Sequence, residues 1–377
     1  MGEHVENDVA WVDFDVMERF AVDVFKGLGV PDEDARVCAD VLVAADKRGI
    51  YSHGVNRMKP IYYDRIKIGI QHPVTNFEIV REGPTTAVVD GHDGMGQVIG
   101  KRSMALAIEK AKRYGMGMVA ARNSTHYGIA GYYTMMAADA GMIGVTGTNA
   151  RPSVAPTFGI EAMLGTNPLT FGMPTDEPFP FVLDCATSIS QRGRIEAYEK
   201  MGKELPCCWV ITDDGKGETD AAEVLKGFDR GTTALTPLGG IGEDTAGYKG
   251  YGYSTVVEIL SAALSGGSFL KMLTGMRDGK KGPFHLGHFF IAIDVSAFIE
   301  PAEFRRITGD ILRALRSSRA MPGHGRIYTA GEKEYLFWEE MKDRGIPLNR
   351  ALQKEVLAMR DELGLDRYVF DFAVKER

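Results

Sequence analysis

The sequence has few cysteines, few tryptophans and no excess of positive charge. Its 377 residues include four cysteines and three tryptophans, and its formal net charge is −7. An acidic chain of this kind argues against nucleic acid or an anionic membrane as a partner. Four scattered thiols without a C-x-x-C pair argue against a disulfide framework and a zinc knuckle. They favour a reducing compartment, and we expect a cytoplasmic protein.

Targeting and membrane signals are also scarce. The first ten residues, MGEHVENDVA, lack a basic stretch followed by an apolar run, so we expect no signal peptide. No window approaches 18 uninterrupted apolar residues, so we expect no transmembrane helix. With 44% hydrophobic and 25% charged residues, the chain has a globular composition and is long enough for two or three lobes.

Two common nucleotide-binding motifs are missing. There is no G-x-x-x-x-G-K-[ST] phosphate loop. Gly94, Gly96 and Gly100 follow a predicted strand and precede a predicted helix, but their spacing is G-x-G-x-x-x-G. No strand ending in a ribose-binding acid follows about twenty residues later. We interpret these glycines as a turn in which backbones pass closely, and not as a Rossmann site.

Alternating strand and helix patterns fill the middle of the chain. Residues 85–149 alternate between short β runs and amphipathic helical stretches, and further β runs follow at residues 167–188 and 289–298. Charged helical patterns occupy both ends. The pattern predicts an α/β protein with a helical lobe built from residues 1–76 and 295–377 and a β-rich lobe built from residues 77–294.

The stretch YSHGVNR, residues 51–57, combines a hydroxyl, an imidazole and a guanidinium. His53 and Arg57 are four residues apart, so a helix would place them on one face. Arginine binds a carboxylate through two hydrogen bonds, and histidine exchanges a proton near neutral pH. The pair suits an acid whose neighbouring carbon bears an oxygen. The alternative is a helix that starts at Ser52 as N-cap, with two exposed polar groups.

Five further positions have both a functional and a structural interpretation. His126 lies between a predicted strand and a predicted helix, where α/β proteins form sites, or it is a satisfied residue at a helix start. Asp184 ends an apolar strand and must be paired or exposed. Lys249 lies among glycines at the head of a helix, where it binds an anion or is solvated. His285 and His288 would point to opposite faces of a strand, so we predict no metal site.

Eight short stretches occur in a fixed order: KRGIYSHGVNR, DGMGQVIG, RNSTHYGIAGYY, GTNPLTFGMP, LDCATS, LGGIGEDTAGYKGYG, GHFFIAID and TAGEKE. Together they resemble the malate/L-lactate dehydrogenase family of nicotinamide-dependent 2-hydroxyacid oxidoreductases. The family includes sulfolactate, ureidoglycolate and diketogulonate enzymes and an imino-acid reductase. The resemblance spans residues 14–364 and implies a bilobed, non-Rossmann dehydrogenase fold and a homodimer.

The resemblance also implies roles for individual residues. Its proton-exchanging group is the histidine of the S-H-G motif in most members and the histidine of the N-S-x-H motif in others, so both remain candidates. The substrate site would contain the catalytic residues His53, Ser52 and His126 and the substrate-binding residues Arg57, Arg48 and Thr166. The cofactor, NAD or NADP, would contact Asp184, Cys185, Ala186, Thr187, Ser188, Lys249, Gly331 and Glu332.

Two departures from the family pattern affect these roles. Arg151 stands where relatives more often have a small or polar residue, and it adds a charge for substrate or cofactor. Ala330 and Lys333 replace a frequent proline and arginine near the cofactor turn. We expect hydride transfer between NAD(P) and a small 2-hydroxy acid such as malate or lactate. The alternatives are reduction of a cyclic imino acid or a larger keto acid, and a catalytically silent dimeric binding protein.

Overall fold

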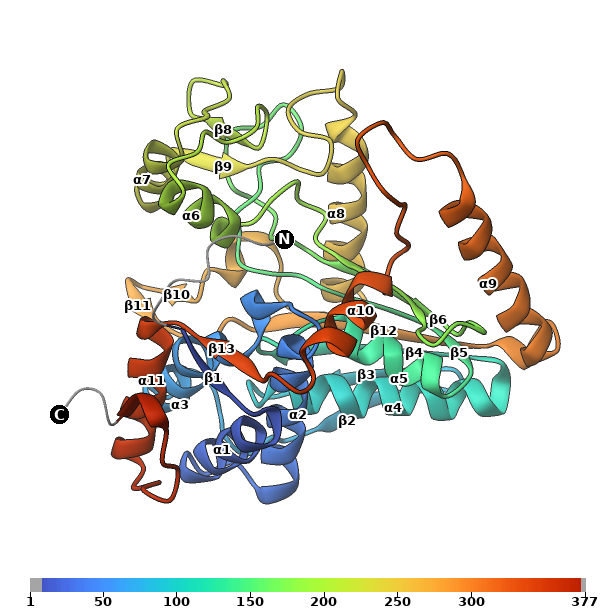
Figure 1. The fold of residues 1–377 in the computed structure, drawn as a ribbon, viewed down its shortest axis with the longest axis horizontal. Coiled ribbons are helices and arrows are strands. Elements are labelled where there is room, and N and C mark those ends of the chain that lie inside the picture. The colour runs from blue at the N-terminus through green and yellow to red at the C-terminus, as the bar shows by residue number, and fades with distance from the viewer. Residues whose placement is uncertain (1–8, 374–377) are drawn as a thin grey trace.

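A seven-stranded mixed sheet forms the centre of the computed structural model, which describes residues 9–373 (Figure 1). Within it, β3 and β4 run parallel and all other neighbours run antiparallel. The α/β prediction is therefore confirmed. In spatial order the strands are β2 (Glu78–Glu82), β3 (Thr86–Asp90), β4 (Met116–Ser124), β12 (Leu286–Asp294), β5 (Met142–Thr148), β6 (Leu169–Met173) and β7 (Phe181–Cys185).

Helices cover both faces of this sheet. α4 (Gly96–Tyr114) and α5 (Gly131–Asp139) pack on one face, where Phe290 and Ala292 of β12 join their buried cluster. Side chains alternate along a strand, and a Cβ at Gly287 would lie 2.2 Å from the carbonyl oxygen of Ser261. That residue belongs to α8 (Gly247–Ala262), which covers the opposite face.

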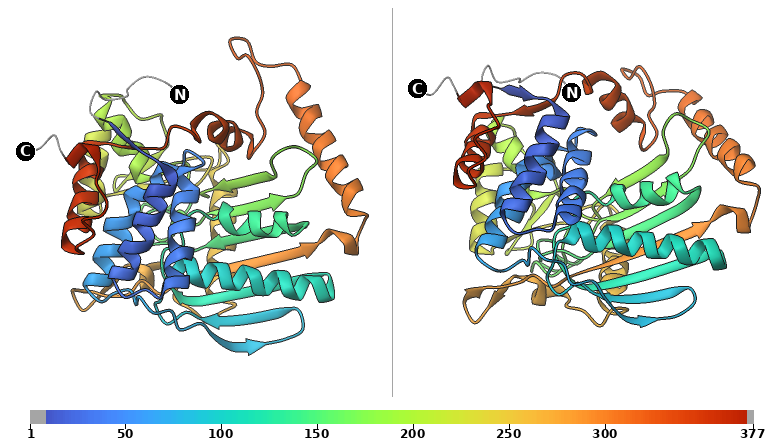
Figure 2. Two further views of the ribbon diagram at one scale, coloured as in Figure 1. Left: turned by 60° about the horizontal axis from the view of Figure 1, so that its bottom comes forward. Right: turned by 90° about the horizontal axis from the view of Figure 1, so that it is seen from below.

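The two ends of the described chain share a second core. β1 (Ala10–Val12) pairs antiparallel with β13 (Ile346–Leu348), and the N-terminal helices lie beside the C-terminal helix in every view (Figures 1 and 2). Buried side chains such as Phe20, Phe25 and Met359 join one hydrophobic cluster there. The helices are α1 (Phe14–Gly27), α2 (Asp32–Asp46) and α11 (Arg350–Glu362).

A smaller layer lies beside the sheet near one end of α8 (Figure 1). Ile195, Val210 and Val224 are buried in its cluster. Its elements are α6 (Arg192–Lys200), α7 (Ala221–Arg230) and the antiparallel pair of β8 (Val210–Thr212) and β9 (Thr233–Leu235). A separate short hairpin contains β10 (Met276–Arg277) and β11 (Lys280–Lys281).

Two helices after the sheet approach it from different sides. α9 (Pro301–Ser317) stands at the edge of the molecule beyond β6 and β7 (Figure 2), and α10 (Glu332–Met341) lies between the sheet and the N-terminal helices. The lobe boundaries at residues 76 and 295 remain a prediction. Within residues 9–373, no helix is long and apolar enough to cross a membrane.

Candidate active site

The segment between α2 and the sheet has an irregular backbone. Short 3₁₀ turns cover Tyr51–His53 and Val55–Arg57, a π-helical stretch covers Met58–Tyr63, and α3 covers Asp64–Lys67. π-Helical segments are frequent at functional sites. The expected helix that starts at Ser52 is therefore wrong, because Gly54, with φ −87° and ψ −146°, interrupts the helical path.

Asp46, at the end of α2, fixes this segment. Its buried carboxylate accepts a hydrogen bond from the Val55 amide at 2.8 Å. A Cβ at Gly54 would lie only 1.9 Å from Oδ1 of Asp46, so only glycine fits there. Burial raises the pKa of Asp46 to about 8 against the opposing effect of the Val55 amide. The carboxyl and the glycine together set the direction in which the turn presents its side chains.

This arrangement makes a testable prediction about Gly54. Its replacement by alanine forces the new Cβ into the Asp46 carboxyl group, and overpacking of this kind costs about 1–3 kcal/mol of unfolding free energy or more. Chemical denaturation measures the loss. Gly193→Ala is the matched control, because a Cβ there meets nothing within 4 Å. Equal stability of the two variants would contradict the placement of Asp46.

Ser52 orients both functional side chains of its turn. Its hydroxyl lies 2.9 Å from Nδ1 of His53, and its carbonyl accepts a hydrogen bond from Nε of Arg57 at 2.5 Å. The serine therefore does not cap a helix. It ties the imidazole and the guanidinium to one backbone turn, and so it fixes their separation.

The fold brings His53 next to His126, which follows β4. Their rings stack with centroids 5.6 Å apart and planes 20° apart. Nδ1 of His126 lies 2.7 Å from the Tyr62 hydroxyl and accepts a hydrogen bond from the Gly128 amide at 3.3 Å. Burial, with a smaller contribution from Arg57, lowers the pKa of His53 to about 4. Burial, aided by His53 and nearby arginines, also lowers the pKa of His126 well below its usual value.

Two arginines act on the histidine pair, and a third lies near one of them. The charges of Arg57 and Arg65 both act on His126. The charge of the exposed Arg151 acts on Arg65, whose guanidinium stacks on Phe284 at 4.3 Å. Burial lowers the pKa of Arg65, and the charges of Arg151 and Arg57 lower it further. In the part of the chain that the structure describes, none of the three has a carboxylate within ion-pair distance. Partly buried cations without counterions favour the binding of an anion.

Arg65 is not among the site residues predicted from the sequence. The available signal is spacing, since Arg65 lies three residues after Tyr62 and eight after Arg57, and helical neighbours recur at such intervals. Arg48, by contrast, lies elsewhere. Its guanidinium donates to the Ala44 carbonyl at 3.0 Å and lies 2.9 Å from the sulfur of Met135. Burial lowers its pKa.

A cavity of about 580 Å³ adjoins Arg48 on the side of β7 and α10. Asp184 and Gly331 line it, together with positive and aromatic side chains. The positive side chains are those of Lys47, Arg48 and Lys333, and the aromatic side chains are those of Phe179, Tyr328, Tyr335 and Trp338. Asp184 accepts hydrogen bonds from the Gly131 amide at 2.6 Å and the Thr170 hydroxyl at 3.0 Å, while burial raises its pKa. It therefore anchors the start of α5 to β7 at the wall of the cavity.

The other expected cofactor residues lie along or beyond this wall. Cys185 is exposed at the end of β7, and Ala186 follows it. The Thr187 amide donates to the Thr166 carbonyl at 3.0 Å, and the Ser188 hydroxyl donates to Ser190. Lys249 is exposed in the first turn of α8, outside the cavity lining. Thr187 and Ser188 are buried in the segment that follows β7, and neither they nor Lys249 belongs to the lining of the cavity.

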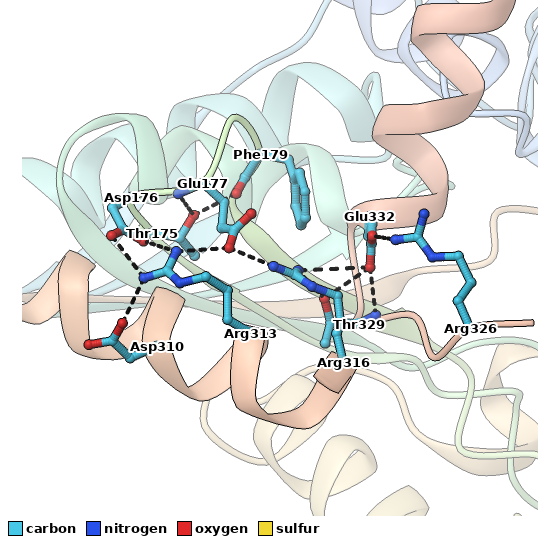
Figure 3. Close-up of polar contacts among 10 residues, drawn as sticks. All are labelled: Thr175, Asp176, Glu177, Phe179, Asp310, Arg313, Arg316, Arg326, Thr329 and Glu332. Carbon is cyan, nitrogen blue, oxygen red and sulfur yellow. Dashed lines mark hydrogen bonds and ion pairs between the residues drawn. The ribbon is translucent and has the colours of Figure 1, made fainter. Parts of the chain in front are cut away.

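A polar network holds the segment that closes the cavity (Figure 3). Arg316 of α9 donates to Glu177 at 2.6 Å and to the Thr329 hydroxyl at 3.1 Å. The buried Glu332 carboxylate accepts the Thr329 amide at 3.1 Å and pairs with Arg326. Glu332 therefore organises the turn that contains Gly331. Its oxygens are engaged with the protein itself.

Known proteins share this architecture. A family model for malate/L-lactate dehydrogenase matches residues 12–357. The malate dehydrogenase of Pyrococcus horikoshii is 45% identical, covering 96% of this chain and 98% of its own. The L-sulfolactate dehydrogenase of Methanocaldococcus jannaschii is 39% identical, with 93% and 96% covered. The crystal structure of malate dehydrogenase from Entamoeba histolytica has a TM-score of 0.91 at 46% identity, with 94% and 98% covered.

The mixed sheet and these full-length matches define the class as an oxidoreductase that acts on 2-hydroxy acids. The chain belongs to the malate/L-lactate dehydrogenase family, as its eight ordered stretches predicted. Membership implies a nicotinamide cofactor, and the prediction of a 2-hydroxyacid dehydrogenase is confirmed. These matches to dehydrogenases favour an enzyme over the alternative of a catalytically silent binding protein.

Proposed function

We propose that this chain catalyses the reversible oxidation of malate to oxaloacetate with NAD. The observation that carries the substrate is the pair of Arg57 and Arg65 beside two histidines with lowered pKa values, with Arg151 close enough to act on Arg65. A 2-hydroxy acid with a second carboxylate supplies two negative charges to this pair, one for Arg57 and one for Arg65. The malate dehydrogenases at 45% and 46% identity support the same substrate.

The hydrogen bonds of the two histidines favour different roles. Burial raises the pKa of Tyr62, so its hydroxyl keeps its proton and donates to Nδ1 of His126. Because Nδ1 accepts, the proton of neutral His126 is on Nε2. His53 has only the Ser52 hydroxyl at Nδ1, and that hydroxyl can accept a hydrogen bond from Nδ1–H as readily as it can donate one. Its Nε2 is then free to act as the base.

These roles give a simple proton path. Arg57 holds the carboxylate next to the reacting carbon. In oxidation, Nε2 of His53 accepts the hydroxyl proton, while Nε2–H of His126 donates a hydrogen bond to the same oxygen. In reduction, the His53 imidazolium returns its proton to that oxygen. A nicotinamide held in the adjoining cavity would supply the hydride chemistry in both directions.

The cavity beside β7 and α10 fits such a cofactor. Arg48 and Lys333 bring positive charge for phosphates, and Tyr335 and Trp338 offer flat surfaces for rings. Glu334 also lines the cavity. A carboxylate there suits ribose hydroxyls and repels a 2′-phosphate, so we prefer NAD to NADP. Asp184 and Gly331 would form the wall against which the cofactor lies, with Thr187 and Ser188 in the segment that follows β7.

A substrate panel tests this proposal. Purified protein is mixed with NADH or NADPH and with oxaloacetate, pyruvate, sulfopyruvate or a cyclic imino acid, and loss of the reduced cofactor is followed by absorbance. We expect the highest kcat/KM with oxaloacetate and NADH. A higher value with pyruvate or the imino acid would contradict the dicarboxylate assignment. Turnover with none of them would contradict these substrates altogether.

Replacing Arg65 tests whether this arginine binds the second carboxylate of the substrate. In Arg65→Gln, we expect KM for oxaloacetate to rise by about thirtyfold, consistent with about 2 kcal/mol for a charge-assisted hydrogen bond. KM for pyruvate should change little, because pyruvate has no second acidic group. Arg113→Gln, an exposed arginine of α4, is the control. An equal rise for both keto acids would show that Arg65 does not select the dicarboxylate.

We also propose a homodimer formed through α8. One face of this helix packs on the sheet, yet Tyr253, Val256 and Ile259 on its other sides are 57%, 47% and 53% exposed, and Leu264 just after its end is 49% exposed. A helix that is apolar all round is normally buried, and monomers rarely expose a contiguous apolar face. In a dimer with two-fold symmetry, the same face of α8 in a second copy of the chain would cover these side chains.

If the protein dimerises through α8, a single substitution on that helix should convert the dimer to a monomer. Ile259→Asp places a charge in the centre of the face, so we expect a monomer by analytical ultracentrifugation where the unmodified protein is a dimer. Ile311→Asp on α9 is the matched control, since Ile311 is similarly exposed at 55%. A dimeric Ile259→Asp protein would exclude this face as the contact.

The remaining proposals concern organisation and location. We propose that the shared core of the terminal segments and the mixed sheet are the two lobes of a non-Rossmann dehydrogenase. Its site would lie where α2 and the turn after it meet the sheet. A cytoplasmic location is supported by four cysteines that are all free thiols.

A further inference from the structure

Cys207 and Cys208 are adjacent in sequence and in contact in space. Their sulfur atoms lie 3.1 Å apart. Consecutive side chains in an extended chain point to opposite sides, so two neighbouring thiols do not normally meet. Of the four cysteines, Cys38 is buried and Cys185 is exposed, and neither has another thiol as a recorded partner. The Cys207–Cys208 pair is therefore a distinct chemical feature of this chain.

An unusual backbone brings the two thiols together. Cys208 has φ +69°, a left-handed conformation that residues other than glycine rarely adopt. Its carbonyl accepts the Thr236 hydroxyl at 2.6 Å, and the next carbonyl, of Trp209, accepts the Thr236 amide at 3.1 Å. A Cβ at Gly240 would lie 3.0 Å from the Cβ of Cys208. The surrounding chain thus holds a strained residue in place, as occurs at functional sites.

The pair is accessible and lies near the wall of the proposed cofactor site. Cys207 is exposed and Cys208 is half-buried. The Thr236 carbonyl accepts the Ile189 amide at 3.0 Å, and the Thr187 carbonyl accepts the Leu238 amide at 2.8 Å. The strand-like contact that fixes Cys208 therefore also fixes the segment from Thr187 to Ile189.

We propose that Cys207 and Cys208 form a dithiol site that low-molecular-weight disulfides oxidise to a ring disulfide. The Cys207 thiolate attacks one sulfur of the small disulfide, which forms a mixed disulfide and releases one small thiol. The Cys208 thiolate then displaces the second small thiol and closes the ring. The protein loses two hydrogen atoms and two electrons, and the small disulfide becomes two thiols.

Ring closure also changes the backbone that Thr236 contacts. The two sulfurs must approach each other to bonding distance, and the peptide between the cysteines becomes part of an eight-membered ring. The Cα of Cys208 is a member of this ring, so the Cys208 carbonyl attached to it shifts when the ring closes, and its hydrogen bond from Thr236 weakens. We expect oxidation to lower the affinity for NADH severalfold. This second consequence rests on the proposed cofactor segment, whereas the ring chemistry does not.

Mass spectrometry tests the ring directly. The protein carries Cys185→Ser, which removes the other exposed thiol, and is incubated with oxidised glutathione in the absence of air. We expect the intact mass to fall by two hydrogens without a glutathione adduct, and dithiothreitol to restore it. Adding Cys207→Ser should instead leave a stable adduct on Cys208 or no reaction. A stable adduct on the protein with both cysteines, or two unreacted thiols, would overturn the proposal.

Fluorescence titration with NADH measures the second consequence on protein that retains Cys185, because that residue is an expected cofactor contact. The oxidised protein should bind NADH severalfold more weakly than its reduced form, and Cys207→Ser should show no such difference. Ring formation with unchanged NADH affinity would overturn the link to the cofactor segment. Absence of NADH binding in the reduced protein would instead contradict the proposed function, so the two failures are distinguishable.

Discussion

Replacing His53 with alanine is expected to lower the turnover of malate by about a hundredfold or more, the usual contribution of a general base. Affinity for NADH should stay close to that of the unmodified protein, because His53 lies at the substrate side and does not line the cavity beside β7. Steady-state kinetics give the first quantity, and fluorescence titration gives the second. Near-normal turnover would move the base to His126.

His126→Gln is the comparison that separates the two histidines. Removal of one hydrogen-bond donor to the reacting oxygen also lowers turnover, by about a hundredfold in comparable sites. The base, however, remains in this variant. The acid limb of the pH–rate profile should therefore persist in His126→Gln and disappear in His53→Ala. Loss of the acid limb in His126→Gln and its persistence in His53→Ala would show that His126 is the base.

The pH dependence has a definite sign. The pKa of His53 is lowered to about 4 in the free protein, so its imidazole is neutral above that pH and ready to accept a proton. Carboxylates of a bound substrate favour the charged imidazolium and raise this pKa. Because kcat/KM reports the free enzyme and kcat reports the complex, the acid limb of kcat should lie at the higher pH.

Much of the fold could be predicted from periodicity. β4 (Met116–Ser124) coincides with the predicted strand, and α4 and α8 fall where amphipathic or apolar helical patterns were found. α9 (Pro301–Ser317) was not singled out, because its charged pattern has little to distinguish it from the other terminal helices. The pairing of β12 between β4 and β5 joins residues that are 140 or more positions apart, and local patterns do not specify such contacts.

The site was predictable in its residue types and less so in its geometry. His53 and Arg57 follow from one motif, but their common anchor, Ser52, was expected to cap a helix. That expectation failed because Asp46 and Gly54 meet although they are eight positions apart, a contact that spacing alone does not reveal. Arg65 was missed for a similar reason. Its position beside the histidines depends on the π-helical stretch before it, and that irregular segment has no simple sequence period.

Substitution of Arg57 has the broadest expected effect on substrates. In Arg57→Lys, the planar fork that matches a carboxylate becomes a point charge, and the hydrogen bond from Nε to the Ser52 carbonyl is lost. We expect kcat/KM to fall by about a hundredfold or more for every 2-keto acid, since truncating one partner of a buried charged pair costs about 2–5 kcal/mol. Kinetics with oxaloacetate and pyruvate measure this loss.

The comparison with Arg65→Gln shows which carboxylate each arginine holds. Every 2-keto acid has a carboxylate next to the carbonyl, so loss of Arg57 should penalise oxaloacetate and pyruvate alike, whereas loss of Arg65 should penalise oxaloacetate alone. Arg57 also contributes to the lowered pKa of His53, so Arg57→Gln should shift the acid limb of kcat/KM to higher pH. If the Arg57 variants lost activity with oxaloacetate alone and the acid limb of kcat/KM did not move, the roles of Arg57 and Arg65 would be exchanged.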